Sequence, residues 1–294
     1  MINENERLGV IARQELPHDI ASAWIALFRP AVRFRTADTG VRVGQLGGDP
    51  SLPTDMEWPA CEAGPLNHIA TVDCAALPRQ SLDVPLPSAG SLLFFYLDGS
   101  YSPDGSPDPL GQGARRGQPE GARVIFIPAG AAVRGRPTPA GLRRYSSADL
   151  TAEPVVTGPS REHVLLHEVR LESGLSLAEA AEEVEVGEGA EGEDVFTEVV
   201  YLAGGEGPRH QVGGYSDPIQ GAAESEIASL VLDGGFQNPR FAAEAAEWVL
   251  LAQFGSDPAR EMLWGDVGSL YWLIRRDDLA AGRFDLARFT LQTG

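Results

Sequence analysis

Short runs of apolar residues, separated by clusters of glycine and proline, dominate the sequence and predict a strand-rich fold. Each run is brief, rich in β-branched or aromatic residues and bounded by turn-forming residues, as buried strands are. The predicted strands lie over Val32–Val43, Leu66–Asp73, Ser91–Tyr96, Arg123–Pro128, Glu162–Leu171, Trp248–Phe254, Ser269–Ile274 and Phe284–Gln292.

Few segments show helical spacing. Leu16–Phe28 carries one apolar stripe, with Pro17 suited to its first turn and Pro30 ending it. Shorter helices are predicted where a capping box or an N-cap pair precedes helix-forming residues. These helices begin at Ser176, run from Asn238 through Glu247, and cover Asp277–Ala281 before Gly282.

The same order of features occurs twice along the chain. Each copy contains a Gly-Gly turn, a buried strand that ends in a polar turn, and a second strand opened by Gly-Ser-Leu. The copies comprise Gly47-Gly48, Ile69–Asp73 and Gly90–Phe95, then Gly213-Gly214, Leu251–Gly255 and Gly268–Leu273. This order predicts an internal pseudo-repeat. We therefore expect an α+β fold with mixed or antiparallel sheets, in which two similar halves pack as one globular unit.

The repeat divides the chain into four parts. Residues 1–40 form an N-terminal helix and lead-in strand, and residues 41–150 form the first half-repeat, with a Gly- and Pro-rich loop at 99–121. Residues 151–205 connect the halves and include an acidic loop at 179–198. Residues 206–294 form the second half-repeat.

Charge narrows the classes of partner. The 42 acidic residues outnumber 23 basic ones, all of them Arg, which gives a net charge of −19. Such a chain is a poor binder of nucleic acid or anionic membranes and favours a basic protein partner. Nine acids lie in the loop at 179–198, so part of the charge is local.

The expected location is the cytoplasm. The N-terminus has no apolar signal-peptide core, and the apolar runs are too short to span a bilayer. The two cysteines, Cys61 and Cys74, are too few for a disulfide scaffold. We expect no membrane association, and the sequence does not specify an oligomeric state.

Motifs for familiar chemistry are missing, so no cofactor and no metal is expected. The sequence has no G-x-S-x-G elbow, Walker A loop or H-E-x-x-H motif. A literal G-x-G-x-x-G match at 187–192 does not follow a strand, and its two Glu would repel a pyrophosphate. The pair His163 and His167 lacks the Glu of a zinc helix, and Cys61, His68 and Cys74 lack zinc-ligand spacing.

One block could line a ligand pocket. Gln253, Asp257 and Asp266 offer hydrogen bonds, and Trp264 and Tyr271 offer aromatic faces. The alternative is that Asp and Gly residues here form only tight turns. If a pocket lies between the two halves, His68 and Asp73 would contribute from the first half.

These motifs also carry a family resemblance. The segments Leu46–Pro53, Trp58-Pro59 and Met262–Tyr271, the last with its Trp-Gly-Asp-x-Gly block, resemble the YwqG-like family, a bacterial domain of unknown function. The resemblance implies an α+β fold with an internal pseudo-repeat and supplies no catalytic residues. Thr71 and Gly255 depart from the Gln and Asp usual in the family.

Two functions remain open. The first is a non-enzymatic binding or protein-interaction module, an immunity- or antitoxin-like role included. The alternative is a small-ligand-binding protein or enzyme with a pocket between the halves around Gln253, Asp257, Trp264 and Asp266. Whether the chain is an enzyme is left undecided.

Overall fold

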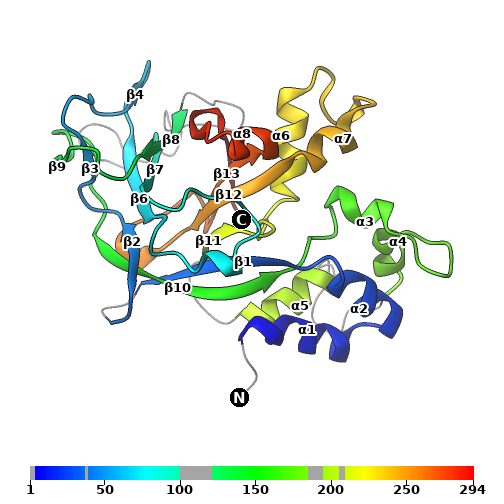
Figure 1. Cartoon of the computed structure of the whole chain (residues 1–294). Helices are drawn as coiled ribbons and strands as arrows, with labels where there is room; N and C mark the ends of the chain where they lie inside the picture. Colours follow the sequence, from blue (N-terminus) through cyan, green and yellow to red (C-terminus); the bar gives the residue numbers. More distant parts are fainter. Residues whose placement is uncertain (1–3, 37–38, 100–120, 185–194, 205–208) are drawn as a thin grey trace.

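The computed structural model describes residues 4–36, 39–99, 121–184, 195–204 and 209–294. Among these residues, one ten-stranded antiparallel sheet organises the chain (Figure 1). Its strands in spatial order are β14 (Arg288–Gln292), β13 (Ser269–Arg275), β12 (Trp248–Gly255), β11 (His210–Gly213), β1 (Arg29–Thr36), β10 (Ala148–Thr157), β2 (Arg42–Leu46), β6 (Asn67–Asp73), β7 (Ser91–Tyr96) and β8 (Ala122–Ile127). Two small ladders accompany it, β3 (Ser51–Pro53) with β9 (Val133–Gly135) and β4 (Ala60–Cys61) with β5 (Gly64–Pro65).

The sheet curls almost into a barrel around an aromatic core. Phe94 of β7 lies 5.2 Å from Phe254 and 5.3 Å from Trp272, between ring centroids. Tyr96 packs in the same way on Phe289 of β14. Residues from the two ends of the sheet therefore share one main core, which burial of these large rings stabilises.

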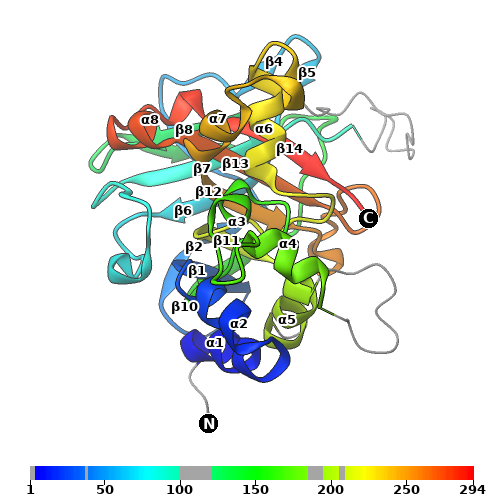
Figure 2. The same ribbon diagram turned by 90° about the vertical axis from the view of Figure 1, so that its right-hand side faces the viewer.

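Helices cover the outside of the sheet in two groups (Figure 2). The first group is α1 (Glu4–Glu15), α2 (His18–Ile25), α3 (Val164–Glu168), α4 (Leu177–Glu182) and α5 (Val195–Gly204). Its own apolar cluster is centred on Trp24, which stacks on Phe196 at 4.7 Å. The second group is α6 (Ala223–Val231) and α7 (Phe241–Ala246), whereas α8 (Arg276–Ala280) buries Leu279 in the main core. Four 3-10 turns complete the described elements: η1 (Arg79–Ser81), η3 (Gly235–Gln237), η4 (Pro258–Arg260) and η5 (Phe284–Leu286).

Most predicted elements are confirmed. Strands β6, β7, β8, β12 and β13 fall where the apolar runs predict them, and β14 covers the second part of its predicted range. Helix α2 lies within its predicted range, and α4 begins with the predicted capping box, in which Ser176 and Glu179 bond reciprocally. The mixed α+β class with a large antiparallel sheet is therefore confirmed.

The strand predicted over Glu162–Leu171 is wrong. This segment contains the short helix α3, because the His163 side chain accepts a hydrogen bond from the backbone N–H of Leu165 and caps the first turn. Leu166 then packs, fully buried, in the cluster of the first helical group. The predicted strand over Val32–Val43 is two strands, β1 and β2.

Three sequence features fall largely outside the described residues. They are the Gly- and Pro-rich loop at 99–121, the centre of the acidic loop at 179–198, and the G-x-G-x-x-G match at 187–192. The described ends of the acidic segment are helical, in α4 and α5.

None of the helices described here has both the length and the apolar character that crossing a bilayer requires.

Candidate functional site

A row of polar side chains crosses the outer face of the sheet. The strand register pairs Glu153 with Arg33, and Arg33 with Gln211. It then pairs Gln211 with Gln253, and Gln253 with Tyr271. Side chains at paired positions share one face, and their strand neighbours point to the other face, into the main core. The row therefore lies on the side that the helices cover.

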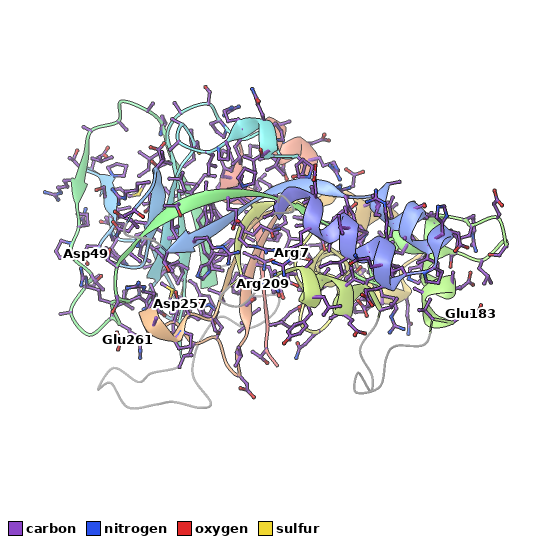
Figure 3. All side chains as sticks on the ribbon, turned by 90° about the horizontal axis from the view of Figure 1, so that it is seen from below. Arg7, Asp49, Glu183, Arg209, Asp257 and Glu261 are labelled. Atoms are coloured by element: carbon purple, nitrogen blue, oxygen red, sulfur yellow. The ribbon has the colours of Figure 1, made fainter. Side chains whose placement is uncertain are left out.

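A pocket lies over this row, between the strands and helices α1 and α5. Its apolar wall includes Leu8, Phe196 and Val200, and its polar wall includes Arg33 and Arg209. Figure 3 shows Arg209 between the helical group and the strands. The space inside the pocket is about 60 Å³, far less than the range of about 300–1,000 Å³ that is usual for sites of drug-sized ligands, so the group bound inside must be small.

The two guanidinium groups in this pocket have unused donors. Arg33 is only 8% exposed, yet its Nε has no hydrogen-bond partner among the described residues, and its Nη1 makes only a long 3.5 Å contact with the carbonyl oxygen of Gly204. The Nη1 of Arg209 is likewise buried and unpartnered within the described parts of the chain. A buried donor left unpaired costs about 1–3 kcal/mol. An acceptor that reached these groups would recover part of that cost.

The pocket carries a net positive charge. Burial, followed by the nearby Arg209, lowers the pKa of Arg33 to about 10, so Arg33 stays cationic at neutral pH. Asp217 is the nearest counter-charge: its Oδ2 lies 3.4 Å from the Nε of Arg209. Two guanidinium groups and one carboxylate give the pocket a net charge of about +1, which one further negative charge would balance.

Two of the predicted site residues hold this ion pair in place. Gln253, fully buried, accepts a hydrogen bond from the N–H of Asp217 at 2.9 Å and donates one to the carbonyl oxygen of Arg209 at 3.2 Å. The Tyr271 hydroxyl donates to the carbonyl oxygen of Asp217 at 2.8 Å. The structure therefore brings Gln253 and Tyr271 together beneath the pocket, where they fix the backbone of both charged residues.

The turn after β11 shapes the same wall. Gln211 donates through Nε2 to the carbonyl oxygens of Gly213 and Tyr215, at 2.8 and 2.9 Å. Gly213 and Gly214 both have positive φ, 69° and 70°, which a residue with a side chain rarely adopts. This turn directs the chain from β11 to Asp217.

The other predicted residues of the second half lie elsewhere. Asp257 lies near the buried ring of His210, 3.8 Å from Oδ2 to Nε2, and this ring lowers the pKa of Asp257. Trp264 is buried in the main core, edge-on to Tyr96 and Tyr145. Asp266 is exposed.

The predicted residues of the first half also serve the local fold. His68 must donate through Nδ1 to the carbonyl oxygen of Gly48, since a carbonyl only accepts, and its Nε2 then accepts from the Thr71 hydroxyl at 2.9 Å. Burial lowers the pKa of His68 to about 4, so the ring is neutral. Exposed Asp73 accepts a hydrogen bond from the N–H of Ala75.

Of the predicted residues, His68 and Trp264 lie on different faces of the sheet. His68 packs on Phe95, whereas Trp264 packs on Tyr96. Phe95 and Tyr96 are consecutive in β7, so their side chains point to opposite faces. Metal-ligand clusters of three or more His, Cys, Asp or Glu are absent from the described part of the chain.

Sequence reasoning missed the arginines of the pocket. Arg33 belongs to the alternating run Val32-Arg33-Phe34-Arg35, which on its own indicates a strand with one solvated face. The signal was the later helical segment 195–204, which covers that face and buries Arg33. The polar side of an alternating strand becomes a site only when another element covers it.

The fold and the pocket define a class: an α+β protein with a nearly closed antiparallel sheet and a small, positively charged pocket beneath its helices. The model of the family described as Domain of unknown function (DUF1963) matches residues 44–293. The chain belongs to this family. No match was found among proteins with curated descriptions.

Proposed function

We propose that this protein is a non-enzymatic binding protein that takes a small anionic ligand, with one negative charge, into the pocket beneath α5. The observation that supports it is the pair Arg33 and Arg209, which line the pocket and keep buried N–H groups without acceptors among the described residues. Charge-assisted hydrogen bonds from guanidinium to an anion are among the strongest available. A carboxylate matches both the small space and the planar donors.

Binding rather than catalysis fits the chemistry of these groups. Arginine stays protonated at neutral pH, so Arg33 and Arg209 donate hydrogen bonds without exchanging protons with a ligand. Asp217 is already paired with Arg209. The pocket is thus suited to hold a charge in a fixed position.

The test is thermal unfolding with added propionate as the probe. At a propionate concentration of about 100 times its Kd, stability rises by about 2.7 kcal/mol, which corresponds to roughly 5 °C for a chain of this size. We expect this shift for the unmodified protein and for Arg134→Met, an exposed control with the same change of charge. Arg33→Met and Arg209→Met are expected to lose it. Equal shifts in all four proteins would contradict the proposal.

Arg33 is expected to lower the free energy of unfolding of the protein when no ligand is present. Arg33→Met keeps the aliphatic stem but removes a buried, incompletely paired charge. We expect the free energy of unfolding to rise by about 1 kcal/mol, measured by urea denaturation. A loss of 2 kcal/mol or more would instead indicate that Arg33 holds the fold together.

We also propose that the chain is a YwqG-like protein and that it contains an internal repeat. Two matching turns support a relation between the halves at 41–150 and 206–294: Gln45 and Gln211 each donate to the carbonyl oxygen two residues later at 2.8 Å. Gly47 and Gly48 have positive φ, as Gly213 and Gly214 do. A YwqG-like identity agrees with such a repeat. The basic protein partner and the cytoplasmic location stay predictions.

A further inference from the structure

We propose that the ligand is a zwitterion, a small α-amino acid with an apolar side chain. This inference rests on the proposed function and names the class of ligand for the same pocket. It comes from two acceptors that lie beside the two arginines and that a simple anion would not contact.

The first acceptor is the Asp217 carboxylate. Its side chain is 30% exposed, so a ligand can reach it. The N–H of Asp217 donates to Gln253 and its carbonyl oxygen accepts from Tyr271, so its backbone is fixed on both sides and the carboxylate is held at the pocket wall. The ion pair with Arg209 is long, at 3.4 Å, which leaves its oxygens able to accept from an ammonium group.

The second acceptor is the C-terminal end of α5. Ala203 and Gly204, at the end of this ten-residue helix, both line the pocket. The last carbonyl groups of a helix lack partners within it and carry a partial negative charge, which favours a cation. Here the carbonyl oxygen of Gly204 has only the long 3.5 Å contact from Arg33, and its second lone pair can accept from an ammonium group. A Cβ at Gly204 would collide with the Arg209 guanidinium, so glycine lets the helix end and the arginine meet closely.

The pocket therefore offers donors and acceptors next to one another. Guanidinium N–H groups suit a carboxylate, whereas Asp217 and the helix end suit an ammonium group a short distance away. The apolar wall formed by Leu8, Phe196 and Val200 suits an aliphatic side chain. An α-amino acid carries these three groups on one carbon atom, and its small size fits the limited space.

Isothermal titration calorimetry with three matched compounds tests the inference. The probes are L-valine, isovalerate (valine without its ammonium group) and isobutylamine (valine without its carboxylate). We expect valine to bind at least ten-fold more tightly than either analogue, because each analogue leaves polar groups of the pocket unpaired. Isovalerate that binds as tightly as valine would overturn the zwitterion but leave the proposed anion pocket standing. If neither valine nor isovalerate binds, both proposals fail.

The variant Asp217→Asn separates recognition from structure. We expect it to weaken valine binding at least ten-fold while isovalerate binds with its original affinity or more tightly. Asp233→Asn, an exposed acid elsewhere, is the control and is expected to change neither affinity. An equal loss for valine and isovalerate in Asp217→Asn would overturn the inference. The urea midpoint of each variant, measured alongside, shows that the protein tested is folded.

Discussion

Trp264→Ala is expected to lower the free energy of unfolding by about 3–5 kcal/mol, the range for removing a buried aromatic side chain. Trp264 is almost fully buried, and its ring lies edge-on to Tyr145 at 5.6 Å and to Tyr96 at 5.8 Å. It joins the loop before β13 to β7, near the other end of the sheet, and to the segment before β10. Its loss leaves a cavity that these strands cannot fill without moving.

Urea denaturation followed by circular dichroism measures this loss, and Trp58→Ala is the control. Trp58 is half-buried at the edge of a smaller cluster and donates to the carbonyl oxygen of Leu66. We expect its replacement to cost clearly less. Because Trp264 packs in the main core, the affinity of folded Trp264→Ala for valine is expected to stay within about two-fold. Lost affinity with little lost stability would instead favour a ligand-stacking role for Trp264.

Local pattern predicted the strands because each strand is bounded by its own turn residues. Val249, Leu250 and Leu251 form a buried run whatever their partners are, and the Gly-Ser-Leu start of β13 fixes where the next strand begins. Register and closure depend on contacts between distant residues. The aromatic contact of Phe94 with Trp272, 178 residues apart, brings the sheet edges together, and no local signal specifies it.

Local pattern also failed where a single side chain decides the backbone. Val164-Leu165-Leu166 is typical of a strand by composition, but the cap from His163 and the apolar cluster around Leu166 select one helical turn. The candidate site shows the same limit. Gln253 and Tyr271 stand out in the sequence as polar residues in an apolar region. Their role depends on hydrogen bonds with Asp217, which lies in a loop that has no evident sequence pattern.

Gln253→Met is expected to reduce both stability and affinity, which links the polar row of the sheet to the pocket. Methionine fills a similar volume but leaves the N–H of Asp217 without its partner, and the carbonyl oxygen of Arg209 keeps only the hydrogen bond from the N–H of Gly255. At about 1–3 kcal/mol for a buried donor left unpaired, the free energy of unfolding falls by about 1–3 kcal/mol. Urea denaturation measures this loss.

Affinity is expected to fall because Gln253 bonds to the backbone of both charged residues. When Asp217 and Arg209 are no longer held in fixed positions, the ligand must order them on binding. The conformational entropy that these residues then lose weakens the binding. Gln45→Met is the control, since Gln45 is also a glutamine that bonds to the backbone, in the turn after β2 on the other side of the central strands. We expect this control to lose stability and keep its affinity for valine. If Gln253→Met lost stability but bound valine as tightly as the unmodified protein, the ion pair would not need its support, and the pocket would be ordered by α5 instead.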